Sequence, residues 1–538
     1  WVDDKRFGRQ LRVESFETVL PATVDGIERY LGSGLIDGIG PTLAKRLVAA
    51  FGVETLRVID EQPQRLRSVD GIGPKRAGQI RDAWQSQKAV QSIMIFLQGH
   101  GVTPRQAAKI YQRYGDSAIA VIRENPYRLA QDIDGIAFRG ADKIAGALGI
   151  EQDAAVRIRA GVRHVLLGAS DDGHVFLPAE ELTERAAELL GVAADATQAA
   201  LAELEARQTV VRDGEAIYFP PFFAAETGVA QRLKELIATP HERVPIQIDN
   251  ALRWVEKKNA IELSGKQADA IRRGVYEKVM VITGGPGTGK TTVLNSLLAI
   301  VEKKGVSFLL AAPTGRAAKR LEAATGHGAR TLHRLLEFSP KTGTFTRNAA
   351  NPLMTDLVVV DEASMIDIQL MHHLVQAVPA FARLVLVGDV DQLPSVGPGN
   401  VLFDIIASQS VPVVRLDTVF RQAAQSGIVS NAHQINAGKF PVFNEEDFFL
   451  IERHEPARAL ETVIELVARR MPSRFGLDPL RDIQVLSPMR RGEAGVNRIN
   501  EALQEALNPD GTAVPRRDFR QGDKVMQLRN NYELDVYN

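Results

Sequence analysis

The chain has 538 residues, with 65 Lys and Arg against 66 Asp and Glu and no Cys. This length predicts about three to five domains, because one hydrophobic core rarely organises so many residues. The lack of Cys excludes disulfides, Cys-ligated zinc and a thiol nucleophile. The formal net charge of -1 means that any nucleic-acid site must be a local basic patch. No apolar run approaches about 18 residues, so we expect no membrane span and a cytoplasmic protein.

Residues 1–20 are polar and lack periodicity, which predicts an irregular linker. Residues 21–150 contain short helical stretches between Gly-rich turns, among them "LIDGIGPTLAKR" and "SVDGIGPKRAGQ". Two looser copies follow, and in the last of them Ala137 replaces the second Gly. Such repetition predicts an array of small helical modules.

The Gly-Ile-Gly turns have two interpretations. The bare N–H groups at the following helix N-terminus can bind a nucleic-acid phosphate, with Lys or Arg close by. Alternatively, the glycines only permit a tight corner between two helices. The candidate DNA-binding residues in these turns are Gly38, Gly40, Gly71 and Gly73.

Residues 151–260 change in character. "LPAEELTERAAELLG" predicts an amphipathic helix, and "TVVRDGEAIYFPP" predicts a hairpin around an Asp-Gly turn. A helix followed by a hairpin is typical of a winged-helix-like module, which either binds DNA or only packs against its neighbours.

From about residue 260, short apolar runs alternate with helical stretches. The runs include "KVMVITG", "SFLLAAPTG", "LVVVDEAS", "RLVLVGD", "VPVVRLD" and "DIQVLSPM". Continuous apolar strands between helices predict an α/β fold with parallel sheets covered on both faces.

The segment "GGPGTGKT" matches the phosphate-loop pattern G-x-x-x-x-G-K-[ST], between an expected buried strand and an amphipathic helix. Backbone N–H groups and the helix N-terminus can hold phosphates, the Lys290 amine can reach the β- and γ-phosphates, and the Thr291 hydroxyl can ligate Mg²⁺. The expected ATP contacts are Gly284, Gly285, Pro286, Gly287, Thr288, Gly289, Lys290, Thr291 and Thr292.

The segment "LVVVDEASM" is an expected buried strand that ends in Asp361 and Glu362. Burying adjacent carboxylates is costly unless a cation compensates them. We therefore expect Asp361 to hold Mg²⁺ through its water shell, and Glu362 to orient and deprotonate the attacking water.

Three further stretches indicate a motor rather than another NTPase. In "LVGDVDQLPSVGPG", Asp389 and Gln392 follow a strand where a side chain can sense a γ-phosphate. In "AAPTGRAAKRL", Thr314 and Arg316 suit contacts with nucleic-acid phosphates. In "LDTVFRQ", Arg421 follows an expected strand of a second sheet, where an arginine can stabilise transition-state charge.

In this order the stretches resemble the motifs of superfamily 1 helicases. "LSGKQADAI" resembles the Q motif, and the stretches above resemble motifs I, Ia, II, III and IV. "DEAS", "GDVDQLPSVGPG", "RTLHRLL" and "LSPMRRGEAGVNRINEALQEALNP" most resemble the RecD-like branch, superfamily 1B. The resemblance covers about residue 260 to residue 538.

The resemblance implies a stand-alone bacterial RecD-like DNA helicase with a helix-hairpin-helix extension at residues 21–150. The region 151–260 would connect this extension to a RecA-like motor domain 1A at 261–410. Residues 411–538 would form an incomplete motor domain 2A with the start of 2B. An SH3-like insert, motif V and motif VI with its arginine finger would all lie beyond Asn538.

The resemblance also implies an activity. The protein would use ATP and Mg²⁺ to move 5′→3′ on single-stranded DNA and unwind duplex at junctions with a 5′ tail, in DNA repair or recombination. It would act as a monomer without the other subunits of the exonuclease complex. Gln267 matches the adenine contact, and His333 would touch the DNA backbone or be structural. The insert 337–352 would form a pin beside the strand junction or remain a surface loop.

Other classes stay open. An AAA+ DNA motor also carries "GPGTGKT", although the Gln-containing motif III and "LSGKQ" argue against it. A relaxase-helicase fusion would need clustered His upstream, which residues 1–260 lack. A non-catalytic DNA-binding scaffold is disfavoured by the intact Lys290, Asp361 and Glu362.

Overall fold

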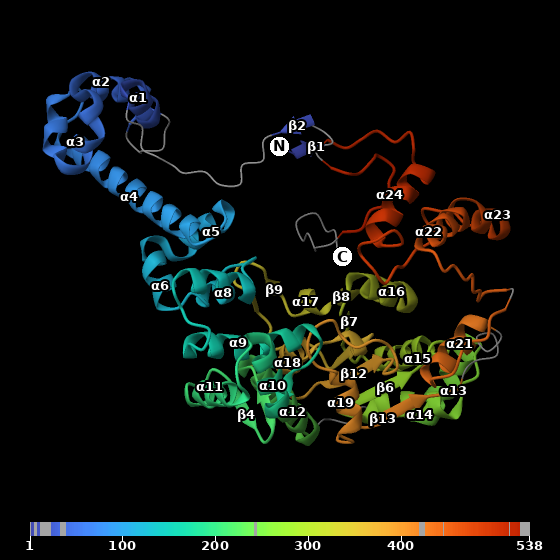
Figure 1. Ribbon diagram of the computed structural model, residues 1–538. Coiled ribbons are helices and arrows are strands. Elements are labelled where there is room, and N and C mark those ends of the chain that lie inside the picture. The colour runs from blue at the N-terminus through green and yellow to red at the C-terminus, as the bar shows by residue number, and fades with distance from the viewer. Residues whose placement is uncertain are drawn as a thin grey trace. The chain divides into compact units, whose positions relative to one another are not determined.

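The computed structural model describes residues 2–4, 8–10, 23–32, 39–240, 245–418, 426–444, 446–515 and 517–527. The chain divides into two compact units (Figure 1). Unit 1 comprises Trp1–Ser170 and Phe176–Pro220, and unit 2 comprises Asp171–Val175 and Pro221–Asn538. Among the described residues, no helix has the length and apolar character needed to cross a lipid bilayer.

Unit 1 is mainly helical. Its helices are α1 (Val24–Gly32), α2 (Pro41–Phe51), α3 (Thr55–Glu61), α4 (Pro74–Gly99), α5 (Pro104–Tyr114), α6 (Ala118–Glu124), α7 (Arg128–Asp132), α8 (Phe138–Ala147), α9 (Ala155–Asp171), α10 (Ala179–Leu190) and α11 (Ala194–Ala206). Strands β1 (Val2–Asp4) and β2 (Gly8–Gln10) pair in antiparallel fashion, so the expected irregular linker at 1–20 contains a short sheet. Backbone pairing needs no apolar alternation, which explains why the sequence pattern missed it.

The helical repeats form two structurally equivalent pairs. α2 and α5 each begin with Pro, and the sixth residue is Arg46 in α2 and Lys109 in α5. Arg46 Nη1 donates to the Asp70 carbonyl at 3.3 Å, and Lys109 Nζ donates to the Asp134 carbonyl at 2.6 Å. In the first pair, a cation on α2 thus contacts the turn that precedes α4. In the second pair, a cation on α5 contacts the turn that precedes α8.

Two hydrophobic cores organise unit 1. The first pair encloses one core that extends from Ile27 to Trp84. The second pair shares a continuous core with the residues that follow, from Ile93 to Ile217. The domain boundary expected at residue 150 is therefore not a boundary of the core, because α8 and α9 pack apolar side chains into the same interior.

The expected hairpin within residues 151–260 is present. β4 (Val211–Asp213) pairs antiparallel with β5 (Ala216–Tyr218), and β5 also pairs with β3 (Phe176–Pro178). With α10 and α11 these strands give the helix-then-hairpin arrangement of a winged-helix-like module.

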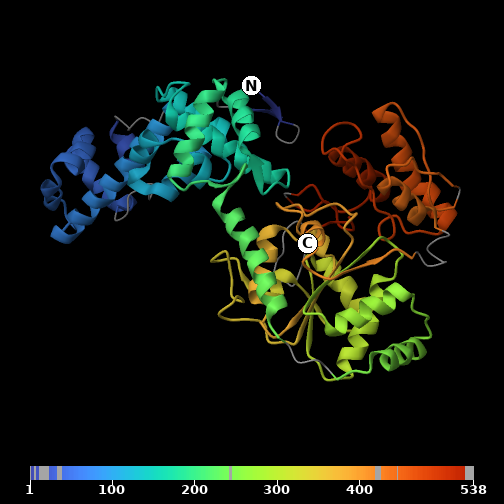
Figure 2. The same ribbon diagram turned by 90° about the horizontal axis from the view of Figure 1, so that it is seen from below.

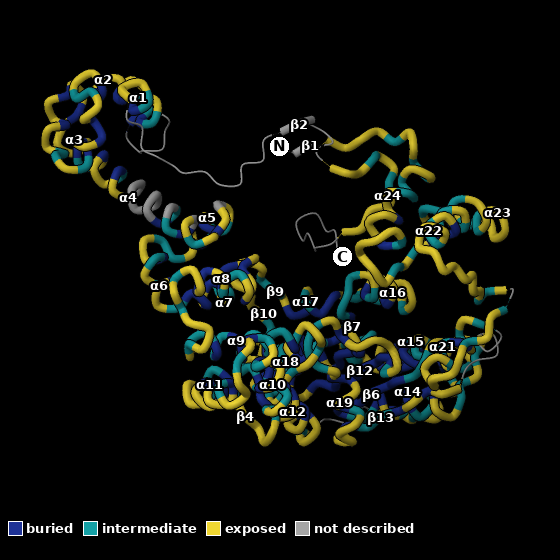
Figure 3. Tube along the Cα trace, in the orientation of Figure 1, coloured by how far each residue is buried: buried dark blue, intermediate teal, exposed yellow. Residues whose placement is uncertain are grey.

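Unit 2 is built around one six-stranded parallel sheet in the order β13-β6-β12-β11-β7-β8. The strands are β6 (Val279–Gly284), β7 (Phe308–Ala312), β8 (Ala329–Thr331), β11 (Leu357–Val360), β12 (Arg383–Gly388) and β13 (Val413–Leu416). Met280 and Ile282 pack into a core with α14 and α15, while the alternate residues Val281 and Val358 are fully buried on the other face. Helices therefore cover both sides of the strands, and the strands themselves are buried (Figures 2 and 3).

Among the described helices of unit 2, the first three precede the sheet, the next five alternate with its strands, and the last four follow it. They are α12 (Pro220–Ala238), α13 (Ile248–Asn259), α14 (Gly265–Tyr276), α15 (Lys290–Glu302), α16 (Gly315–Thr325), α17 (Leu332–Leu335), α18 (Ile368–Ala377), α19 (Val401–Ala407), α21 (Gly427–Asn436), α22 (Pro456–Glu465), α23 (Met471–Phe475) and α24 (Val496–Leu507). The expected insert is a small hairpin of β9 (Phe338–Ser339) and β10 (Thr344–Phe345).

Two strand predictions were wrong. "VPVVRLD" does not begin a second sheet, because β13 pairs in parallel with β6 and buries Val414 and Leu416 in the same core. The expected boundary between motor domains at residue 410 therefore cuts through one sheet. "DIQVLSPM", residues 482–489, is described but forms no strand. The backbone of this segment pairs with no neighbouring strand among the described residues, and the Leu486 side chain is 89% exposed.

Candidate functional site

The phosphate loop connects β6 to α15 at the carboxyl edge of the sheet. Gly287 and Gly289 adopt φ of +76° and +84°, a region that favours glycine. Gly284 is required for another reason, because a Cβ there would lie 2.5 Å from the Leu416 carbonyl oxygen on β13. The glycines thus let the backbone curl at the helix N-terminus, where free N–H groups can bind phosphate.

Lys290 folds back over this loop. Its amine donates to the carbonyl of Gly284 and, at 3.1 Å, to that of Gly285. The Thr288 hydroxyl also donates to the Gly285 carbonyl, at 2.9 Å. These carbonyl contacts hold the Lys290 amine over the loop.

The buried side chain of Gln267 contacts the backbone of the phosphate loop. It is 1% exposed and lies in the first turn of α14, where its Oε1 accepts from the Ser264 amide and closes a capping box. Its Nε2 donates to the Thr288 carbonyl at 3.2 Å. The amide therefore holds the phosphate loop, and its expected adenine contact remains a prediction.

Asp361 and Glu362 follow β11 directly. Burial raises the pKa of both carboxyl groups, and Asp361 further raises the pKa of Glu362. The positive charges of Lys290 and Arg320 partly offset this rise in both pKa values, because they lie within electrostatic range of the two carboxyl groups. Glu362 has φ of +53°, a strained value for a residue with a side chain that costs about 1–3 kcal/mol.

This donor set fits Mg²⁺-ATP. Thr291 is exposed at the start of α15, and Arg320, whose Nη1 lies 4.0 Å from Glu362 Oε1, has a side chain that is 82% exposed and therefore compensates the carboxylate only weakly. Hard oxygen ligands of this kind suit Mg²⁺. Thr291 and Asp361 would hold the ion.

Asp389 and Gln392 follow β12, the neighbour of both β6 and β11. Asp389 is 2% exposed and accepts from Gln392 Nε2 at 3.1 Å. Its charge raises the pKa of Glu362. Thr283 on β6 accepts from the Val390 amide at 3.3 Å, which ties this loop to the phosphate loop. The sequence-predicted acids, lysine and glutamine are therefore brought together at one edge of the sheet.

The expected DNA contacts are distributed differently. Thr314 caps α16, because its hydroxyl accepts from the Ala317 amide at 3.2 Å, whereas Arg316 is exposed. The half-buried His333 ring packs against Phe338 and Phe345, with centroid distances of 5.5 and 5.6 Å, and burial lowers its pKa. This places His333 in an aromatic cluster, and its contact with DNA stays a prediction.

The Gly-Ile-Gly turns are open on their outer side. Gly40 and Gly73 are exposed, and nothing lies within 4 Å of a Cβ built on either residue. Ile39 and Ile72 are buried, as the corner interpretation requires. Gly38 and Arg421 lie outside the described residues.

Sequence reasoning missed two residues of this site. Arg320 contacts Glu362, and the basic run "AAKRL" could have indicated it. The Ser364 hydroxyl is buried without a hydrogen-bond partner among the described residues, two residues after Glu362. A serine in a strand-end turn carries no sequence signal for this burial.

Four family models match the chain. They are described as a SAM-like helix-hairpin-helix tandem (residues 31–86), the helix-hairpin-helix domain of ATP-dependent RecD2 DNA helicases (86–176), an AAA domain (267–398) and the SH3 domain of ATP-dependent RecD-like DNA helicases (499–538). The last match corrects the expectation that the SH3-like insert lies beyond Asn538. The first two meet at residue 86, between the two cores of unit 1.

Curated relatives extend this result. The chain is 32% identical over 562 aligned positions to an ATP-dependent RecD2 DNA helicase of Deinococcus radiodurans, covering 100% of this chain and 75% of that protein. It is 33% identical to the RecBCD enzyme subunit RecD of Mycolicibacterium smegmatis over 51% of this chain and 56% of that one. Among solved structures, the Pif1 helicase from Candida albicans shares 20% identity over 40% of this chain and 55% of that chain, with a TM-score of 0.29.

Proposed function

The chain belongs to the family of ATP-dependent RecD2 DNA helicases, and from this premise we propose that it couples ATP hydrolysis to 5′→3′ movement on single-stranded DNA. The proposal includes unwinding of duplex at junctions with a 5′ tail, in DNA repair or recombination. The protein would act as a monomer without other exonuclease-complex subunits.

One observation carries this proposal. Lys290, Asp361, Glu362, Asp389 and Gln392 follow strands β6, β11 and β12 of one sheet, and the charges of Lys290, Asp361 and Asp389 all act on the pKa of the Glu362 carboxyl group. This arrangement suits hydrolysis of a nucleoside triphosphate rather than mere binding, because it includes a base as well as phosphate contacts.

Each residue would have a distinct role in hydrolysis. Mg²⁺ would neutralise phosphate charge, held by Thr291 and Asp361. Lys290 would leave the loop carbonyls for the β- and γ-phosphates. Glu362 would orient the attacking water and take its proton, and Gln392 would contact the γ-phosphate. Arg421 would stabilise the charge that develops in the transition state.

DNA would bind through Thr314, Arg316 and His333 of the motor domain and through the turns of Gly38, Gly40, Gly71 and Gly73. The contacts would be to the backbone and independent of base sequence. The hairpin of β9 and β10 would meet the strand junction and split it.

The direct test is ATP hydrolysis with and without single-stranded DNA. The wild-type chain should show stimulation by DNA. Lys290→Ala should abolish turnover while DNA binding, measured by fluorescence anisotropy, persists. A wild-type chain that binds DNA but does not hydrolyse ATP would support a non-catalytic scaffold instead.

A further inference from the structure

The hairpin of β9 and β10 is too short to hold its own shape. It contains two cross-strand pairs, Thr344 with Ser339 and Phe345 with Phe338. Isolated two-stranded hairpins are marginal in water even when they are longer. Residues 340–344, around the turn, are exposed. Any mechanical work by the turn therefore depends on contacts at the base.

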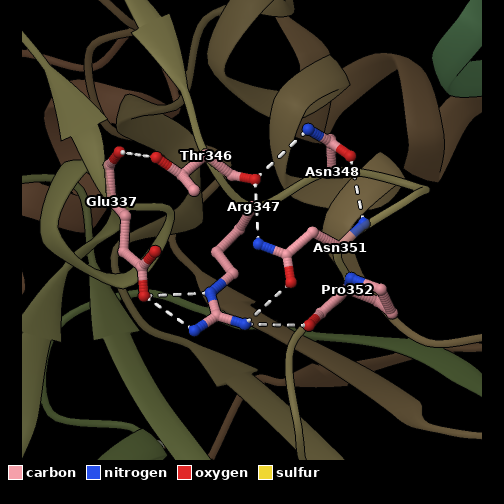
Figure 4. Close-up of polar contacts among 6 residues, drawn as sticks. All are labelled: Glu337, Thr346, Arg347, Asn348, Asn351 and Pro352. Atoms are coloured by element: carbon pink, nitrogen blue, oxygen red, sulfur yellow. Dashed lines mark hydrogen bonds and ion pairs between the residues drawn. The ribbon is translucent and has the colours of Figure 1, made fainter.

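A polar brace closes this base (Figure 4). Arg347 Nε and Nη2 both donate to Glu337 Oε1, at 3.0 and 2.8 Å. Its Nη1 donates to Asn351 Oδ1 and to the Pro352 carbonyl, both at 3.3 Å. The Thr346 hydroxyl donates to the Glu337 carbonyl at 3.2 Å. One guanidinium thus ties both ends of the insert.

An aromatic contact holds the hairpin on its other side. The Phe345 ring lies 4.5 Å from the ring of His373 on α18, measured between centroids. Phe338 lies 5.0 Å from Phe345 in the same cluster. The hairpin therefore packs on α18 as well as on the segment that carries His333.

Helix α18 connects the hairpin to the residues of the proposed ATP site. It begins at Ile368, three residues after the end of the turn Ala363–Met365, which follows Glu362. Its first amide, of Ile368, donates to the Pro398 carbonyl at 2.9 Å in the loop that carries Gln392. A Cβ on Gly397 of that loop would lie 2.6 Å from Asp367 Oδ2, so loop and helix are in close contact.

We propose that Arg347, which ties the two ends of the insert together, and His373, which holds Phe345 on α18, are positioning residues that keep the hairpin in place, so that force generated at the ATP site reaches the strand junction. This inference rests on the proposed strand-separating function. Neither residue needs to touch ATP or the translocating strand. Loss of either would uncouple unwinding from hydrolysis.

The test compares unwinding with hydrolysis in the same variants. Arg347→Met removes the guanidinium and keeps most of the side-chain volume, and His373→Ala removes the ring. Each should slow displacement of a 5′-tailed duplex by about tenfold, while ATP turnover on single-stranded DNA stays within about twofold of wild type. The loss should be larger on GC-rich than on AT-rich duplexes, because a hairpin that is not held in place separates the more stable GC pairs less effectively.

Three variants serve as controls. His373→Phe keeps an aromatic ring and should restore unwinding. Glu337→Gln keeps the backbone and one acceptor, and should give an intermediate loss. Arg185→Met breaks an exposed ion pair with Glu181 on α10 and should change nothing. Thermal unfolding checks that each variant folds.

Two results would overturn the proposal. One is unchanged unwinding by Arg347→Met and His373→Ala. The other is an equal fall of single-strand ATPase and unwinding, which would mean a damaged motor rather than a loose hairpin. Failure of the proposed function is distinct, because the wild-type chain itself would then not displace a strand.

Discussion

Gln392 Nε2 donates to Asp389 Oδ2 over 3.1 Å, and so joins an exposed amide to a buried carboxylate. Asp389 acts electrostatically on Glu362. Gln392 and Glu362, the proposed γ-phosphate sensor and the proposed catalytic base, are therefore linked through one carboxylate. A γ-phosphate that attracts the Gln392 amide would break this hydrogen bond.

The first prediction concerns Gln392. Gln392→Ala should lower kcat for ATP by about 100-fold, the usual effect of removing a single donor to developing charge. The KM for ATP should change little, because Lys290 and the loop still hold the phosphates. Steady-state ATPase with single-stranded DNA measures both, with Gln369→Ala, exposed on α18, as control. A raised KM at unchanged kcat would contradict a sensor role.

The second prediction concerns the effect of the Glu362 carboxylate on the stability of the fold. The pKa of Glu362 is raised in the folded chain, so its contribution to the unfolding free energy is greatest at low pH and is lost as pH rises through the folded pKa. At neutral pH the charged group destabilises the fold. Glu362→Gln should therefore raise Tm without nucleotide by about 2 °C and lower hydrolysis by about 100-fold or more.

Differential scanning fluorimetry without nucleotide measures this effect. Glu461→Gln, an exposed acid on α22, is the matched control and should leave Tm unchanged. A lower Tm for Glu362→Gln would show that the carboxylate stabilises the fold.

The third prediction concerns Lys278 at the opposite edge of the sheet. Burial, with Arg383 and Arg232 nearby, lowers its pKa to about 8. Its amine donates to the carbonyls of Ala380 and Ala382 at 2.6 and 2.9 Å. Between pH 8 and the unfolded value of 10.5 the unfolded chain binds more protons, so the unfolding free energy rises with pH.

Urea unfolding at several pH values isolates this group. The difference between wild type and Lys278→Met should grow by about 1 kcal/mol per pH unit in this window. A difference independent of pH would mean that Lys278 has an ordinary pKa.

The fourth prediction concerns the helix-hairpin-helix turns. Lys75 is exposed in the first turn of α4, after Gly73. If this turn binds a phosphate of duplex DNA, Lys75→Ala should reduce the slope of log K against log salt by about 1. Arg185→Ala is the control, because Arg185 pairs with Glu181 on α10 and lies in neither Gly-Ile-Gly turn. An unchanged slope for Lys75→Ala would make this turn a structural corner.

Several features were predictable because their chemistry is local. "GGPGTGKT" after an apolar run indicates a phosphate loop, and an apolar run ending in Asp361 and Glu362 indicates buried acids that need a cation. The structure places these acids and Lys290 within electrostatic reach. The capping box of Ser264 and Gln267 was also predictable, because the sequence carries the pattern S-x-x-Q at the start of this helix.

Other features depend on distant parts of the chain. An apolar run such as Val413–Leu416 fits any parallel sheet, so its pairing with β6 could not be read from sequence. The same holds for the core shared across residue 150 and for Phe345 on His373. The equivalence of Arg46 and Lys109 follows from the repeat, but their carbonyl partners appear only in three dimensions.

Strand displacement from tailed duplexes tests the central claim most directly. The wild-type chain with ATP and Mg²⁺ should displace the strand of a 5′-tailed duplex and leave a 3′-tailed duplex intact, and Lys290→Ala should displace neither. Displacement from the 3′ tail alone would contradict the proposed polarity. Displacement by Lys290→Ala at the wild-type rate would contradict ATP-driven unwinding altogether.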